Sequence, residues 1–209
     1  MQVVLATSNP GKQRELQSLL APLGYEVLLQ SSLGIAAPEE TGSTFEANAL
    51  LKARHAARAA ALPALADDSG LEVDALGGRP GVYSARYAGA GASDAANNER
   101  LLAELEGLAP ERRGARYRCV LAFVRGAEDP EPLLVSGAWE GRIGDSPRGS
   151  GGFGYDPLFI PAGLACTAAE LPAAEKNRLS HRGKALQALV ARLVALGLHD
   201  RADTCGGVR

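Results

Sequence analysis

The sequence predicts an α/β protein built on a mixed β-sheet with helices packed against it. Apolar runs of strand length alternate with segments whose leucines recur at helical spacing, and two neighbouring strands in the second half predict an antiparallel pair. The 209 residues and the hydrophobic share of 46% are enough for one large domain, or for two lobes that share a core. Neither a linker nor an internal repeat divides the chain. We therefore predict a single domain over residues 1–197, followed by a loose tail over 198–209.

The first elements alternate between strand and helix. The apolar run at 2–6 is followed by a polar loop and by leucines at helical spacing over 16–23. A second strand is expected at 25–30. The order is therefore strand, loop, helix and strand.

A capping box predicts the start of the next helix. Ser43 and Glu46 have the spacing of this motif, and the alanine-rich helix that they open is expected to reach about residue 61. Asn48, Lys52 and His55 share one face of this helix. That face is a candidate for polar contacts.

An acidic pair follows the third predicted strand. The strand at 63–66 is expected to be brief and to end at Asp67-Asp68-Ser69-Gly70, after which apolar and polar residues alternate over 71–76. Adjacent side chains of an extended strand point to opposite faces. Asp67 and Asp68 are therefore expected to differ in role, one catalytic and the other structural.

The second half of the chain predicts two helices, three apolar segments and a glycine-rich loop. In chain order these are a helix from Ser93, strands at 116–124 and 133–139, a loop at 149–154, an aromatic-rich segment at 155–160, and a last helix capped by Ser180 and ended by Gly197.

Charge and cysteine usage exclude several classes of protein. The 22 basic and 24 acidic residues nearly balance and form no long basic block, which argues against a duplex-binding face and for a small anionic ligand held locally. No apolar run approaches the length of a membrane span, and the first residues lack the pattern of a signal peptide. The three scattered cysteines, Cys119, Cys166 and Cys205, fit neither a disulfide framework nor a zinc site. We expect a reduced, cytoplasmic protein that binds neither nucleic acid nor membrane.

The first loop is a candidate phosphate site. Residues 7–12, Thr-Ser-Asn-Pro-Gly-Lys, lie between a strand and a helix, where backbone amides and the helix dipole favour an anion and Lys12 adds a charge. The Walker A spacing is absent. The alternative is a polar turn capped by Ser or Asn, and position alone favours neither interpretation.

The acidic pair is a candidate metal site. Mg²⁺ needs few carboxylates when water and substrate phosphates complete its shell, so Asp68 with one further acid such as Glu40 would suffice. Taken alone, such a pair before Ser-Gly is more often a solvated turn.

Two later segments could bind a flat ligand. Phe153 lies among glycines and is followed by Asp156, which would allow stacking on the ring and polar contacts at its edge. The basic segment at 176–184 places Lys176, His181 and Arg182 before the last helix. The alternatives are a tight turn over the core and a solvated charged surface.

Together these segments resemble the family of inosine and xanthosine triphosphate pyrophosphatases, the Ham1-like enzymes that clear non-standard purine nucleotides. The resemblance spans nearly the whole chain and rests on six ordered segments: 7–12, 44–49 with Lys52, 66–71, 77–87, 151–157 and 180–183. It departs from the family pattern at Ser8, where glycine is common, around Cys166, and in the tail.

The resemblance implies an elongated fold with a cleft between two lobes, a homodimer, and hydrolysis of ITP, dITP and XTP to the monophosphate and pyrophosphate with Mg²⁺. Asp68 and Lys52 are the expected catalytic residues, and Asp68 and Glu40 the expected metal ligands. The implied substrate-binding residues are Thr7, Ser8, Asn9, Pro10, Gly11 and Lys12 at the triphosphate, with Ser69, Phe153, Gly154, Tyr155, Asp156, Lys176, His181 and Arg182 at the rest of the nucleotide.

Three other interpretations compete with this prediction. A Maf-like pyrophosphatase for other bases would share the loop and the acids but not the His-Arg segment. A nucleotide-binding module without turnover would need only the phosphate loop and the aromatic platform, and the acidic pair with Lys52 argues against it. A purely structural α/β protein leaves the clustered glycines unexplained.

Overall fold

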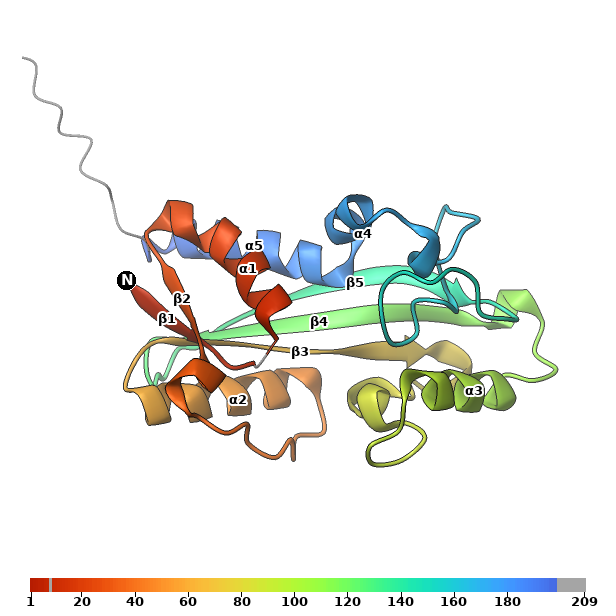
Figure 1. Cartoon of the computed structure of the whole chain (residues 1–209), viewed down its shortest axis with the longest axis horizontal. Helices are drawn as coiled ribbons and strands as arrows, with labels where there is room; N and C mark the ends of the chain where they lie inside the picture. The colour runs from red at the N-terminus through yellow and green to blue at the C-terminus, as the bar shows by residue number, and fades with distance from the viewer. Residues whose placement is uncertain (8, 199–209) are drawn as a thin grey trace, which may run out of the picture.

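A six-stranded mixed sheet forms the centre of the protein in a computed structural model that describes residues 1–7 and 9–198 (Figure 1). The strand order is β2-β1-β3-β4-β5-β6, with β1 parallel to both β2 and β3 and the remaining pairs antiparallel. The strands are β1 Gln2–Leu5, β2 Glu26–Leu29, β3 Ala64–Val73, β4 Gly114–Val124, β5 Leu133–Ile143 and β6 Phe159–Pro161. The predicted mixed sheet and its antiparallel pair are confirmed.

Helices cover both faces of the sheet (Figure 1). One face carries α1 and α5, whose leucines pack with alternate residues of the strands in one apolar cluster. The other face carries α2, whose alanines allow close packing against β3 and β4. The helices are α1 Pro10–Leu20, α2 Phe45–Ala60, α3 Asp94–Glu104, α4 Ala173–Leu179 and α5 His181–Ala195, and short 3₁₀ segments occupy Ala21–Leu23, Gln30–Leu33, Asp74–Leu76, Gly81–Arg86, Pro110–Arg112 and Ala168–Glu170.

The molecule is long because β3, β4 and β5 extend well beyond β1 and β2 (Figure 1). At the far end, aromatic side chains of β4, β5 and β6 pack with leucines of α3 in a separate cluster that includes Tyr117, Trp139 and Phe159. Hydrophobic packing is therefore concentrated toward the two ends of the long strands. The division into two lobes stays a prediction.

The third strand has one free edge where the acidic pair lies. Strand β1 ends at Leu5, which pairs with Leu65, whereas β3 continues to Val73 and pairs with β4 along its whole length. Between Leu65 and Leu71 the edge that faced β1 is open to side chains from both faces of the sheet, whereas farther along Leu71 and Val73 donate their amides to Ser84 and to the carbonyl of Arg79. This step in the sheet positions the candidate site.

The structure corrects two of the local predictions. The strand predicted to end before the acids runs through them, because antiparallel pairing with β4 continues and cationic partners satisfy both carboxylates. The helix α2 begins after Thr44, whose side chain accepts the amide hydrogen of Ala47, so Ser43 is not the cap. Glu46 instead pairs with Arg118.

Other predicted boundaries are confirmed. Ser93 and Ser180 cap α3 and α5 through their side chains, and Gly197 follows α5 with a left-handed φ of 66°. Cys119 and Cys166 are free thiols. Cys205 and all of the predicted tail after residue 198 lie outside the described residues. None of the helices in the described part of the chain is long and apolar enough to cross a membrane.

Candidate active site

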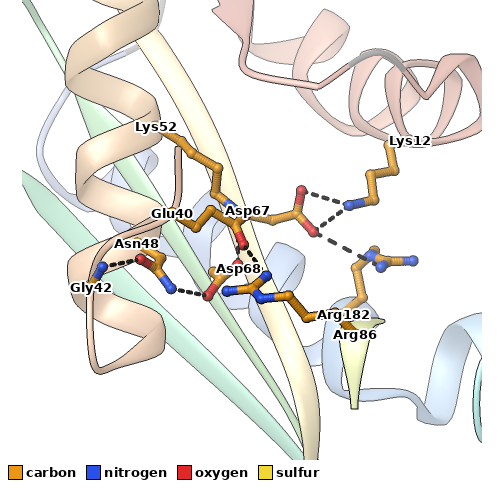
Figure 2. Close-up of polar contacts among 9 residues, drawn as sticks. All are labelled: Lys12, Glu40, Gly42, Asn48, Lys52, Asp67, Asp68, Arg86 and Arg182. Carbon is orange, nitrogen blue, oxygen red and sulfur yellow. Dashed lines mark hydrogen bonds and ion pairs between the residues drawn. The ribbon is translucent and has the colours of Figure 1, made fainter. Parts of the chain in front are cut away.

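The two adjacent acids point to opposite faces of β3, as the extended backbone predicts (Figure 2). Asp67 faces the side of α1 and α5, and Asp68 faces α2. Both side chains are buried. Their partners are therefore different, and the strand separates two charged clusters.

Asp68 is held by groups from α2 and the loop before it. Lys52 Nζ donates to Asp68 Oδ1 at 2.7 Å and to Glu40 Oε1 at 2.8 Å. The fully buried Asn48 donates its amide to Asp68 Oδ2 at 3.3 Å and accepts the N–H of Gly42 at 2.8 Å. Of the three residues predicted to share a face of α2, Asn48 and Lys52 meet Asp68, whereas the ring of His55 contacts the carbonyl of Ala36 at 2.9 Å.

Burial sets the ionisation of this cluster. Burial raises the pKa of Asp68, against the effect of Lys52 and with a further rise from Glu40. Burial also opposes the charge on Lys52, but the carboxylates of Asp68 and Glu40 outweigh it and raise the pKa of the amine. The pKa values of Lys52 and Asp68 can both be raised because Lys52 is stabilised by two carboxylates, whereas Asp68 shares its one ammonium partner with Glu40. A carboxylate with a raised pKa is suited to act as a general base near neutral pH.

Glu40 and Asp68 form a pair of carboxylates that fits a magnesium ion. Both reach the same ammonium group, so they lie within reach of one cation. Among the described residues no group of three or more His, Cys, Asp and Glu side chains is arranged to hold a metal. Two carboxylates are enough for Mg²⁺ when phosphate oxygens and water complete its shell.

Asp67 holds cations from two helices on the other face. Lys12 Nζ donates to its two oxygens at 2.9 and 2.7 Å, and Arg182 Nη2 lies 3.9 Å from Oδ2 (Figure 2). Burial opposes ionisation, but Lys12 and Arg182 prevail and lower the pKa of Asp67 to about 2. Asp67 is therefore an ionised carboxylate.

The predicted phosphate loop leads into α1. Asn9 caps the helix and accepts the amide hydrogens of Gly11 and Lys12 at 2.8 and 3.3 Å, while Thr7 accepts that of Asn9. The amides at this helix end are thus engaged by Asn9, rather than bare as the phosphate interpretation assumed. Pro10 begins the helix, and Ser8 lies outside the described residues.

A cavity of about 200 Å³ adjoins the Asp67 face. All of the residues predicted to bind the rest of the nucleotide line it: Ser69, Phe153, Gly154, Tyr155, Asp156, Lys176, His181 and Arg182. Phe153 is 63% exposed, and Lys176 Nζ and Arg182 Cζ lie 5.1 and 5.8 Å from its ring centre. An exposed aromatic ring beside two cations is a platform for a flat, electron-rich ligand.

Residues that the sequence did not single out hold the loop of this cavity. Gly154 donates its backbone N–H to Asp94 at 2.6 Å, and its carbonyl accepts from the side-chain amide of Asn98 at 3.0 Å, so α3 fixes both backbone polar groups of this residue. Asp156 accepts from the backbone of Phe153 and pairs with Lys176. Only the spacing of Asp94 and Asn98, one helical turn apart, could have suggested this clamp.

His181 forms part of the cavity wall as a neutral ring. It stacks on Tyr117 with ring centres 4.8 Å apart, and burial, with the charges of Arg182 and Lys176, lowers its pKa to about 3. Within residues 1–7 and 9–198, His181 Nδ1 and Arg182 Nε are buried without hydrogen-bond partners. Such atoms are available to a ligand.

The buried imidazole predicts a loss of stability on mild acidification. The folded-state pKa lies below the unfolded value, so the unfolded state binds more protons as pH falls from about 6.5 toward 3. We expect the free energy of unfolding to fall by roughly 1–2 kcal/mol between pH 7 and pH 5 from this residue. Urea unfolding at pH 5 and pH 7 should show this decrease in the free energy of unfolding for the unmodified protein, and a smaller decrease for His181→Gln. A nuclear magnetic resonance titration of His181 with a midpoint near 6.5 would contradict this.

Comparisons with known proteins agree on one family. Residues 3–192 match the model of the Ham1 family. The dITP/XTP pyrophosphatase of Methylococcus capsulatus is 61% identical over 194 residues, which are 93% of this chain and 96% of that protein. The dITP/XTP pyrophosphatase of Yersinia pseudotuberculosis is 57% identical over 191 residues, covering 91% and 97%. A HAM1 protein structure from Coxiella burnetii superposes with a TM-score of 0.90 at 47% identity, covering 93% and 99%.

Proposed function

The chain belongs to the Ham1 family, and from this premise we propose that it hydrolyses ITP, dITP and XTP to the nucleoside monophosphate and pyrophosphate. One observation supports this most directly. The cavity with the aromatic and basic wall lies next to β3, and this strand carries both Asp67, which is bound by Lys12, and Asp68. The proposed sites of base recognition and of phosphate hydrolysis are therefore adjacent. Because the chain belongs to this family, the Maf-like and non-catalytic alternatives are set aside.

Asp68 supplies the general base in this proposal. Its carboxylate orients or deprotonates the water that attacks the α-phosphorus, and pyrophosphate leaves. Asn48 and Lys52 fix the carboxylate through two hydrogen bonds. The raised pKa from burial makes the carboxylate a better proton acceptor than a free aspartate.

Lys12 and Lys52 provide positive charge at the phosphates. In an enclosed site such fixed charges stabilise the charge that develops on the phosphate oxygens. Glu40 and Asp68 would hold Mg²⁺, which when bound neutralises phosphate charge and polarises the phosphoryl group. The residues of the loop at 7–12 would bind the triphosphate.

Base selectivity follows from the donors in the cavity. Arg182 only donates hydrogen bonds, so it matches the 6-oxo group of hypoxanthine or xanthine and leaves the 6-amino group of adenine without an acceptor. A site of this kind discriminates strongly because a mismatched base leaves buried polar atoms unpaired. The homodimer implied by the family resemblance and the cytoplasmic location expected from the cysteine usage remain predictions.

A single assay tests the proposal. The protein is incubated with ITP, dITP, XTP and the four standard triphosphates, with and without Mg²⁺, and the released product is identified as pyrophosphate or phosphate. We expect Mg²⁺-dependent release of pyrophosphate from ITP, dITP and XTP. Cleavage of ATP as fast as ITP, or release of phosphate, would overturn the proposal.

A further inference from the structure

One carboxylate connects the two ends of the proposed nucleotide site. Asp67 accepts two hydrogen bonds from Lys12, in the first turn of α1, and faces Arg182, in the first turn of α5 (Figure 2). Lys12 belongs to the proposed phosphate end and Arg182 to the wall of the base cavity. The two cations come from helices more than a hundred residues apart in sequence, yet they share one partner.

Asp67 is the fixed member of this group. Its side chain is only 7% exposed, and its backbone is paired with β4 at Leu121 inside a continuous ladder. The side chains of Lys12 and Arg182 are longer, and they are 24% and 19% exposed. The positions of the two cations are therefore set by the carboxylate more than the reverse.

The contacts of Asp67 separate it from the proposed general base. Its hydrogen bonds and ion pairs go to Lys12 and Arg182, whereas those of Asp68 go to Lys52 and Asn48 across the strand. The Lys12 contact uses both oxygens at short distances, and the Arg182 contact is longer. Two unequal contacts on one carboxylate mean that loss of the stronger partner leaves the carboxylate free to attract the weaker one.

We propose that Asp67 is a positioning residue that shares its carboxylate between Lys12 and Arg182 and thereby couples the phosphate end of the site to base selectivity. This inference rests on the proposed function of the same site. With Lys12 in place, Arg182 stays at a distance from Asp67 and is available to the base. Without Lys12, Arg182 moves toward Asp67 and away from the base.

The test is a cycle of three variants read out by selectivity. The ratio of kcat/KM for ITP to kcat/KM for ATP is measured for the protein, Lys12→Ala, Asp67→Asn and the double variant. We expect Lys12→Ala to lower this ratio about tenfold, although Lys12 lies at the phosphate end. We expect Asp67→Asn to lower it as well, and the double variant to show no further loss.

Controls separate positioning from general damage. Asp129→Asn removes another buried carboxylate, which lies away from the cavity and pairs with Arg125 at 2.6 Å. This variant should leave the ratio unchanged. Thermal unfolding identifies any variant that does not fold, and Lys12→Ala tests the coupling even if Asp67→Asn is unstable. A wild-type ratio in Lys12→Ala would overturn the inference, as would additive losses in the double variant. Failure of the unmodified protein to release pyrophosphate from ITP would instead overturn the proposed function, and the inference with it.

Discussion

Asp68→Asn is expected to bind ITP but to lose turnover by roughly 10²–10⁴-fold, the usual contribution of a positioned general base. The amide has the shape of the carboxylate and still fits beside Asn48 and Lys52, but it cannot accept a proton. Pyrophosphate release gives kcat, and calorimetric titration with ITP gives the affinity. The loss should therefore appear in kcat rather than in binding.

Asp74→Asn is the matched control for this substitution. Asp74 follows the same strand and pairs with Arg116 at 3.0 Å, but it is 55% exposed and does not line the cavity. Its activity should remain close to that of the unmodified protein. Turnover by Asp68→Asn at the unmodified rate would show that another group activates the water.

Lys52→Met is expected to reduce kcat by roughly 10²–10³-fold, as the loss of one fixed electrostatic contact in an enclosed site does. The methionine keeps the apolar stem but removes the ammonium that holds Glu40 and Asp68 together. The buried carboxylate of Asp68 and the half-buried carboxylate of Glu40 then repel each other, and the phosphates lose a stabilising charge. Steady-state kinetics with ITP measure the effect.

Lys184→Ala is the control for lost positive charge. Its amine donates to the carbonyl of Ala138 in β5, and Lys184 does not line the cavity. Activity should be retained there. If Lys52→Met kept full activity, the charge on Lys52 would not contribute to the reaction.

Most of the fold could be predicted because its elements carry local signals. The caps at Ser93 and Ser180 and the leucine spacing of α5 depend on neighbouring residues only, and the structure confirms them. The continuity of β3 through Asp67 and Asp68 could not be predicted from local signals. It depends on Lys12 and on pairing with β4, which are distant in sequence.

The candidate site divides in the same way. The opposite directions of the two acids and the shared face of Asn48 and Lys52 follow from strand and helix periodicity. The contact of Asp67 with Lys12 and Arg182 depends on how the starts of two helices meet over the sheet, which no local pattern contains. The clamp on Gly154 by α3 is of the same kind.

The pairing register between β3 and β4 determines which of the two aspartates serves as the general base. Asp67 and Asp68 are chemically identical, and only their pairing opposite Leu121 and Val120 decides which of them faces α2. A slip of one residue that carries Asp68 into the place of Asp67 would move the general base to the side of Lys12 and bring Ser69, which has no carboxylate, to face α2. Catalytic identity is thus encoded in strand register, so a single-residue deletion that shifts β3 in this direction would silence an enzyme that still possesses every reactive group.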